Sequence, residues 1–168
     1  MATIQSFPPI ADANARILIL GSMPGRVSLD AGEYYAHPRN QFWPIMAELL
    51  QRGPWPDYPA KIQALHHAKI ALWDVMQSCY RPGSLDAAIV QDSIVANDFN
   101  RFFKAYPYIQ QVFFNGTAAE RAFQRLVLPS LVKQTLALKK LPSTSPAHAA
   151  MSYAQKLASW RLIIGLAS

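Results

Sequence analysis

The sequence predicts an α/β protein, a three-layer α/β/α sandwich built around a four-stranded, mostly parallel sheet. Two observations support this class. Four short apolar or β-branched runs each end in turn or polar residues, and the segments between them carry apolar residues at helical spacing. Strands that alternate with helices imply βαβ crossovers and a parallel sheet covered on both faces. Such sheets bind ligands outside the carboxyl ends of their strands, so we expect functional residues just after each strand.

Each apolar run is expected to form a buried strand, because parallel strands are covered on both faces. The four runs are residues 16–21, 69–75, 111–116 and 134–141.

The segments between and after these runs are expected to form helices that cover the sheet. One stripe contains Phe42, Ile45, Met46 and Leu49, and a second contains Ala119, Ala122, Phe123 and Leu126. A closing helix would place Tyr153, Leu157, Trp160 and Ile164 on one face, with its start signal at Ser145 and Pro146. The Pro-rich stretch 53–59 is expected to be an ordered surface loop.

Length and composition favour one domain that spans residues 1–168, since the chain is 51% hydrophobic and can bury a sizeable core. Cys79 is the only cysteine, which excludes an intrachain disulfide, a four-cysteine zinc site and a cysteine-ligated iron–sulfur cluster. We expect no metal and no cofactor. No run approaches the roughly 18 apolar residues of a membrane span, and residues 1–15 do not resemble a signal peptide. A soluble, cytoplasmic protein is expected.

The formal net charge is +6, although only 15% of the residues are charged. A basic excess suits a polyanionic partner such as DNA, but many small proteins are basic for solubility alone. Charge therefore supports a nucleic-acid partner without establishing one.

The first run leads into Gly21-Ser22-Met23-Pro24-Gly25, a rigid turn whose glycines permit close approach of backbone and ligand. A serine hydrolase is not indicated, because the nucleophile elbow needs the spacing G-x-S-x-G. An ordinary turn between strand and loop is the alternative interpretation.

Residues 34–43, Tyr-Tyr-Ala-His-Pro-Arg-Asn-Gln-Phe-Trp, form a dense group of aromatic, imidazole, guanidinium and amide side chains. Aromatic faces can stack on an extruded base, and an amide can orient a water molecule. The alternative makes Tyr34, Phe42 and Trp43 core residues and Asn40 a helix N-cap. For Phe42 and Trp43 we favour the core interpretation.

Taken together, GSMPG and YAHPRNQFW resemble the paired motifs of the uracil-DNA glycosylase superfamily. The likeness is greatest to its hypoxanthine-DNA (deoxyinosine) glycosylase branch, because Ser22 and Met23 stand where other branches carry an asparagine or acidic residue. The resemblance extends from Ile17 to the final helix. It implies the fold expected above and an enzyme that cuts the N-glycosidic bond of a deaminated base.

The resemblance also implies roles for particular residues. Asn40 matches the catalytic asparagine, and Tyr35 matches the aromatic residue that stacks on the flipped base. The base pocket would be lined by Gly21, Ser22, Met23, Pro24, Gly25, Tyr35, His37 and Asp74. Asp74 either reads the base edge or serves as a turn or capping residue, and Asn115-Gly116 equally makes an ordinary turn.

A third motif, Leu-Pro-Ser-Thr-Ser-Pro at residues 141–146, matches the superfamily segment that clamps the DNA backbone. Pro142, Ser143 and Ser145 are therefore expected to bind DNA, close to the start of the last helix. Leu141 replaces a polar residue, which leaves the stabilisation of the departing base without an assigned group. His148 either substitutes for it or is an exposed helix residue.

The function that this resemblance implies is hydrolysis of a deaminated base, with hypoxanthine as the first candidate, from DNA, and we expect a monofunctional, monomeric enzyme. We expect Lys139 and Lys140 to lie at the surface as a pair, and we do not expect either to act as a Schiff-base nucleophile. A uracil or G:U mismatch glycosylase is the alternative within the class. A non-catalytic nucleic-acid binding domain is the alternative outside it.

Overall fold

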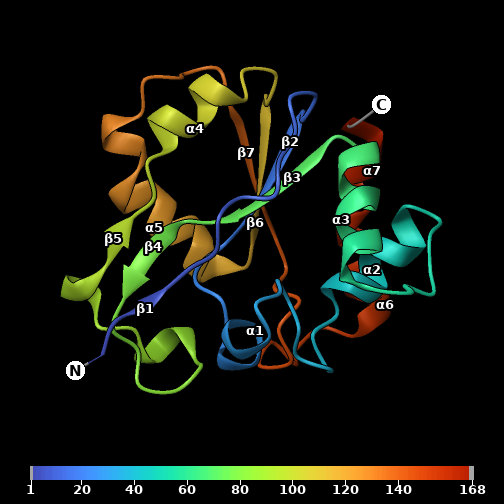
Figure 1. The fold of residues 1–168 in the computed structure, drawn as a ribbon, viewed down its shortest axis with the longest axis horizontal. Coiled ribbons are helices and arrows are strands. Elements are labelled where there is room, and N and C mark those ends of the chain that lie inside the picture. Colours follow the sequence, from blue (N-terminus) through green and yellow to red (C-terminus); the bar gives the residue numbers. More distant parts are fainter. Residues whose placement is uncertain (1, 167–168) are drawn as a thin grey trace.

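The computed structural model describes residues 2–166 (Figure 1). Its main sheet has four strands in the order β3-β2-β6-β7, and every pairing is parallel. The strands are β2 (Ile17–Gly21), β3 (Ile70–Asp74), β6 (Gln111–Asn115) and β7 (Ala137–Leu141). The predicted four-stranded parallel sheet is thereby confirmed.

Helices cover both faces of this sheet, as predicted (Figure 1). One face packs against α4 (Phe99–Ala105) and α5 (Thr117–Leu126). The opposite face packs against α2 (Phe42–Leu49), α3 (Tyr58–His67), α6 (Tyr153–Trp160) and α7 (Leu162–Leu166). The short helix α1 (Arg26–Ala31) follows β2 at the carboxyl end of the sheet, at the bottom of Figure 1.

The two cores arise from the alternation of side chains along β2. Ile17 and Ile19 point into the core beneath α2 and α6, whereas Leu18 and Leu20 point toward α4 and α5. All four are fully buried. Because both faces are covered, β2 reads as a continuous apolar run.

A second, smaller sheet was not predicted. It is antiparallel, in the order β1-β4-β5, and consists of β1 (Ile4–Gln5), β4 (Met76–Cys79) and β5 (Val95–Ala96). Strands of two to four residues are too short to show a two-residue period. Short 3₁₀ turns occupy Asp86–Ala88, Gln91–Ser93 and Leu128–Ser130.

Two local expectations were wrong. The run 134–141 yields a strand only from Ala137, and four of its five residues are exposed, because β7 is the edge strand of the sheet. The last helix does not begin at Ser145-Pro146. Ser152 caps α6 in a reciprocal capping box with Gln155, and Ile164 lies in the separate helix α7. The capping box offers two side-chain hydrogen bonds that the earlier Ser-Pro pair does not form.

The Pro-rich stretch 53–59 runs along the surface into α3, so its last two residues are already helical. The Trp55 indole N–H donates to the carbonyl of Trp43 at 3.2 Å, which fastens the loop to α2. Within the described residues, every helix is too short or too polar to span a lipid bilayer.

Candidate functional site

The carboxyl ends of the parallel strands bring three polar segments together. Gly21 at the end of β2 pairs in register with Asp74 at the end of β3, and Asn115 at the end of β6 pairs with Leu141 at the end of β7. This end of the sheet lies beside α1 at the bottom of Figure 1. The predicted site residues from separate parts of the chain therefore share one edge of the sheet.

The turn after β2 is fixed from its outer side. Ser22 donates its hydroxyl to the carboxylate of Asp86 at 2.8 Å, and the Pro24 carbonyl accepts from the buried guanidinium of Arg81 at 2.8 Å. The Met23 side chain is buried in the core. A ligand at this turn would accordingly meet backbone, and Gly25 is the N-cap residue of helix α1.

Gly21 is the point of closest approach in the site. A Cβ atom there would lie 2.6 Å from Asp74 Oδ1 and 3.0 Å from the Tyr35 hydroxyl. Only a glycine leaves room for both groups. Two polar side chains from different elements thus converge over the same backbone atom.

Tyr35 has a left-handed backbone with φ of 54°, which turns its ring inward. One face of the ring packs on Phe42, with centroids 4.3 Å apart. The hydroxyl is buried and lacks a hydrogen-bond partner among the described residues. Burial and the nearby Asp74 raise the pKa of this phenol, so it stays a neutral donor.

Asn40 and His37 form a compact turn ahead of α2. The His37 carbonyl accepts from the Asn40 N–H at 2.9 Å, and His37 Nδ1 accepts from the Arg39 N–H at 3.0 Å. Asn40 Oδ1 accepts from the Phe42 N–H at 2.9 Å, one residue ahead of the N-cap position held by Gln41. The Asn40 side chain therefore supports the start of α2, while its amide oxygen keeps a second lone pair.

Tyr34, Phe42 and Trp43, the neighbours of these residues, are core, as the alternative interpretation held. The Trp43 indole N–H donates to the Tyr34 carbonyl at 2.7 Å, and the Tyr34 hydroxyl donates to the Pro8 carbonyl at 3.0 Å. The aromatic density of the motif therefore serves mainly to anchor the turn that carries Asn40.

Asp74 is 3% exposed, and its Oδ2 atom has no hydrogen-bond partner among the described residues. Burial raises the pKa of its carboxyl to about 8, and the negative charge of Asp86 adds to this, while Arg81 opposes it. The carboxyl is therefore mainly uncharged at neutral pH. The turn or capping role considered for Asp74 is not seen, since its side chain makes no backbone hydrogen bond.

Arg81 and Asp86 are site residues that the sequence reasoning missed. Arg81 is 6% exposed and also donates Nε to the Gly83 carbonyl at 3.0 Å, so it ties the segment after β4 to the turn after β2. Burial raises the pKa of Asp86, which Ser22 and Arg81 counteract. No spacing in the sequence marks either residue, because their partners lie far away along the chain.

The 141–146 segment carries its predicted serines in regular turns. Ser143 Oγ accepts from the Ser145 N–H at 3.1 Å, and Ser145 Oγ accepts from the Ala147 N–H at 3.2 Å. Each hydroxyl hydrogen remains free to donate to another group. Pro142 contributes its carbonyl, which accepts from the Trp160 indole at 2.9 Å. Leu141 is buried in the core, so β7 supplies no polar side chain at its end.

Helix α6 begins at Tyr153, which corrects the expectation that the last helix starts at Ser145 and Pro146. Near its start, the buried Lys156 of α6 contacts the serine segment, with Nζ 3.5 Å from the Ser145 carbonyl. Burial lowers the pKa of Lys156. His148 is half-buried in a turn before α6 and is not the exposed helix residue considered above.

Thr144 connects this segment to the other two. It is fully buried and exchanges two hydrogen bonds with Asn115, and its carbonyl accepts from the Gln41 N–H at 3.0 Å. Gln41 directly follows Asn40. The last segment thus positions the turn that carries Asn40.

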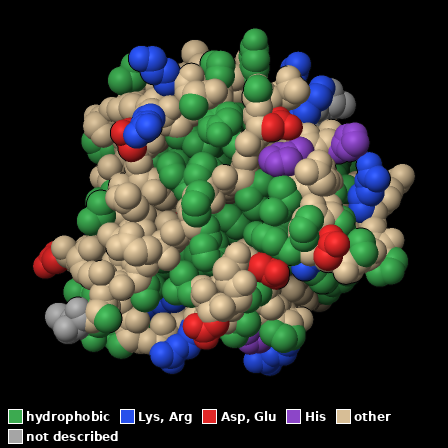
Figure 2. Space-filling view, viewed as in Figure 1, with side chains coloured by type: hydrophobic (Ala, Val, Ile, Leu, Met, Phe, Trp, Pro, Cys, Tyr) green, Lys and Arg blue, Asp and Glu red, His purple; other side chains and the backbone are tan. Residues whose placement is uncertain are grey.

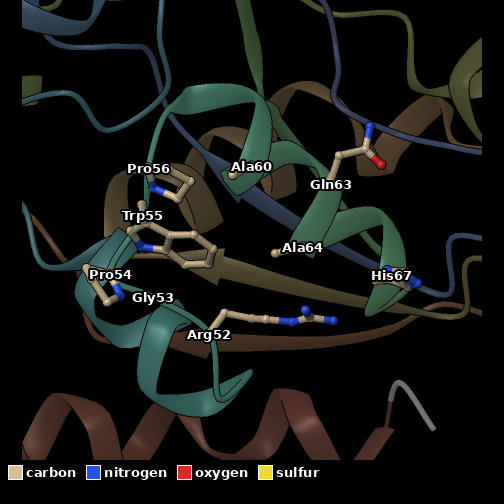
Figure 3. Close-up of a pocket in the computed structure, with 9 residues that line it drawn as sticks. All are labelled: Arg52, Gly53, Pro54, Trp55, Pro56, Ala60, Gln63, Ala64 and His67. Carbon is tan, nitrogen blue, oxygen red and sulfur yellow. The ribbon is translucent and has the colours of Figure 1, made fainter.

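Two surface cavities lie outside this cluster. One, of about 300 Å³, separates the Pro-rich loop from α3, with the ring of Trp55 pointing toward Ala64 (Figure 3). The other, of about 790 Å³, adjoins the site through Asp86 and Thr117 and includes Arg121 and Arg125 of α5. None of the predicted site residues lines the first cavity.

Basic side chains do not form one patch on the face drawn in Figure 2, where they are dispersed around the rim and hydrophobic side chains cross the centre. Among the described residues, no group of three or more His, Cys, Asp or Glu is arranged to hold a metal ion.

The fold and the site define an α/β protein that gathers its polar residues at the carboxyl ends of a parallel sheet. The model of the uracil DNA glycosylase superfamily matches residues 8–163, and the chain belongs to that superfamily.

Two similar curated proteins are both named hypoxanthine DNA glycosylase. The one from Methanosarcina barkeri is 39% identical over 113 residues, which cover 67% of this chain and 70% of the relative. The one from Methanosarcina acetivorans is 34% identical over 145 residues, 86% of this chain and 87% of the relative.

A similar solved structure is the solution NMR structure of a candidate uracil DNA glycosylase from Methanosarcina acetivorans. The two share 31% sequence identity and superpose with a TM-score of 0.78, covering 96% of this chain and 99% of that one.

Proposed function

We propose that this protein hydrolyses the N-glycosidic bond of a deaminated base in DNA, with hypoxanthine as the preferred base. The observation that carries the proposal is the convergence of Tyr35 and Asp74 over Gly21, because two buried polar groups without partners lie where a base would contact bare backbone. The names of the two similar hypoxanthine DNA glycosylases support this choice of base.

A base can enter this pocket only when its nucleotide leaves the stack, which costs a few kcal/mol and costs least for mispaired bases. Tyr35 would contact the flipped base through the ring face opposite Phe42 and through its hydroxyl. The backbone of residues 21–25 would form the floor, and His37 would line the rim.

Asn40 would position the attacking water. Its Oδ1 holds the Phe42 N–H, which fixes the amide plane, and the second lone pair of Oδ1 can accept from a water molecule. The amide dipole would also favour the positive charge that develops on the sugar as the base departs. Because Asn40 is held by the start of α2 and its neighbour Gln41 is held by Thr144, little reorganisation is needed during the reaction.

Ser143 and Ser145 would hold the phosphates beside the flipped nucleotide. Each hydroxyl accepts a backbone N–H and so keeps its own hydrogen available to donate to a phosphate oxygen. We propose that the enzyme acts as a monomer and is monofunctional. The second point is supported by Lys139 and Lys140, which are exposed on the edge strand and do not lie among the buried groups of the site. A nucleophilic lysine is instead activated inside a desolvated pocket or beside another cation.

The test is release of the base from matched duplexes that contain one hypoxanthine, uracil, xanthine or normal base, with alkali used to reveal abasic sites. Hypoxanthine release that disappears in Asn40→Ala, with DNA affinity retained, supports the proposal. Release of uracil alone would indicate a mismatch-type enzyme. Absence of release in the wild type, with DNA binding intact, would indicate a binding domain.

A further inference from the structure

We propose that Asp74 is a second catalytic residue, whose uncharged carboxyl donates a hydrogen bond to an acceptor atom of the departing base. This inference rests on the proposed function. It assigns the group that stabilises the leaving base, a role for which β7 offers only the buried Leu141.

The position of Asp74 suits this role. It ends β3, in register with Gly21, and its Oδ1 lies where a Gly21 side chain would otherwise stand. Oδ2 is buried without a partner, and the adjacent Tyr35 hydroxyl is also unpartnered. A buried polar group without a partner costs free energy in the empty site, and a bound base with hydrogen-bonding atoms would remove that cost.

The groups around Asp74 keep its carboxyl protonated. Asp86, from the segment after β4, repels a second negative charge, and the phenols of Tyr34 and Tyr35 are themselves neutral. Arg81 is the one facing cation among the described residues. Its Nε and Nη2 donate to the carbonyls of Gly83 and Pro24, its Nη1 is buried without a hydrogen-bond partner, and its charge offsets only part of the effect of burial and of Asp86 on Asp74. Burial with this balance of charges is the physical reason that the pKa of Asp74 is raised to about 8.

In the reaction, the glycosidic C–N bond breaks and its electron pair stays on the base, where it spreads onto the oxo and ring-nitrogen acceptors. The Asp74 O–H stabilises this negative charge through a hydrogen bond. The water held by Asn40 bonds to the sugar carbon and loses one proton, and the departing base gains one proton. One water is consumed, and Asp74 ends the cycle as a carboxylic acid.

The experiment compares single-turnover release of hypoxanthine between pH 6 and 9.5 for the wild type, Asp74→Asn and Asp74→Leu. The wild-type rate should fall with a midpoint near 8, where Asp74 ionises. Asparagine keeps a donor that does not ionise, so Asp74→Asn should stay within roughly tenfold of the wild type at pH 7. Asp74→Leu should lose on the order of 100-fold or more.

Ionisation of the base itself lowers the rate at high pH in every variant. The role of Asp74 is therefore tested by comparing the pH–rate profiles of the wild type and the variants. The fall should begin at higher pH in Asp74→Asn than in the wild type. Superimposable profiles would overturn the inference while the proposed function stands. Absence of release by the wild type at every pH would instead overturn the proposed function.

Asp86→Asn provides a second, independent readout that leaves Asp74 in place. Removal of the Asp86 charge removes a repulsion that raises the pKa of Asp74, so the alkaline fall should move to lower pH. Asparagine has the same shape as aspartate, and its amide oxygen can still accept from the Ser22 hydroxyl, so this change should keep the turn after β2 in place. A profile that does not move, or moves to higher pH, would contradict the role of Asp74.

Discussion

Asn115 and Thr144 hold each other through two reciprocal hydrogen bonds. The Asn115 amide donates Nδ2 to Thr144 Oγ1 at 3.0 Å, and the Thr144 N–H donates to Asn115 Oδ1 at 2.9 Å. The Thr144 carbonyl in turn accepts from Gln41. These hydrogen bonds connect the end of β6, the serine segment and the turn that carries Asn40. A substitution at Thr144 should therefore change the position of Asn40.

Thr144→Val should reduce both stability and base release. The substitution preserves shape and the backbone N–H, but it leaves Asn115 Nδ2 unpaired in a largely buried site, which costs about 1–3 kcal/mol. Urea unfolding and single-turnover release at saturating enzyme measure the two effects. Thr144→Ser keeps the hydroxyl and is the matched control. Equal behaviour of the Val and Ser variants would show that the hydroxyl pair does not position Asn40.

Gly21→Ala should abolish most base release. The added methyl group would lie 2.6 Å from Asp74 Oδ1 and 3.0 Å from the Tyr35 hydroxyl, and both groups would have to move. Overpacking of this kind also costs about 1–3 kcal/mol of stability. Gly165→Ala in α7 is the control, since its added Cβ would meet nothing within 4 Å and it is not among the residues of the base pocket. Similar release by both variants would argue against a base site at Gly21.

The stability of the protein should decrease as pH rises from about 4 to 8, and Asp74 should be a main cause. The unfolded carboxyl ionises near pH 4, whereas the folded one holds its proton until about pH 8, so the unfolded state is favoured by rising pH within this window. The slope is at most about 1.4 kcal/mol per pH unit. Urea unfolding at several pH values should show that Asp74→Asn gains stability over the wild type as pH increases. A constant difference between the two proteins would refute the raised pKa.

Ser143→Ala combined with Ser145→Ala should weaken DNA binding without slowing the chemical step. Each hydroxyl offers one hydrogen bond to a phosphate, so the pair should cost roughly 1–3 kcal/mol of binding. Fluorescence anisotropy with an uncleavable duplex measures affinity, and single-turnover rates at saturation measure chemistry. Ser130→Ala, in the 3₁₀ turn that follows α5, serves as the control. Unchanged affinity would remove these serines from the DNA interface.

The sheet could be predicted because its inner strands are apolar on both faces. The residues of β2, β3 and β6 bury both sets of side chains, so each appears in the sequence as an unbroken run between turns. The edge strand β7 is not covered on both faces and does not need to be apolar throughout. The prediction that its run is buried was therefore wrong. The end of β7 at Leu141 could still be predicted, because the Pro142 that follows terminates the strand.

The site was predicted in part, through motifs that lie close together in the sequence. Gly21 and Asp74 end neighbouring parallel strands and meet as expected, and the loop between α1 and α2 brings Tyr35 to them. Arg81 and Asp86 were missed because their roles depend on contacts across about 60 residues of chain, as the Ser22–Asp86 bond shows with a separation of 64. The protonation state of the Asp74 carboxyl depends on its burial and on the charges of Arg81 and Asp86. These effects cannot be inferred from the order of residues in the sequence.

The position of β7 at the edge of the sheet also affects whether copies of this protein can associate edge to edge. As the last strand of the sheet, it presents its outer backbone groups at an edge where another chain could add a strand. Lys139 and Lys140 stand on that edge, one on each face. If two copies paired there, four ammonium groups would gather and lose water. Repulsion and the loss of hydration of these lysines, which take no part in the reaction, would therefore disfavour aggregation through the open edge of the sheet.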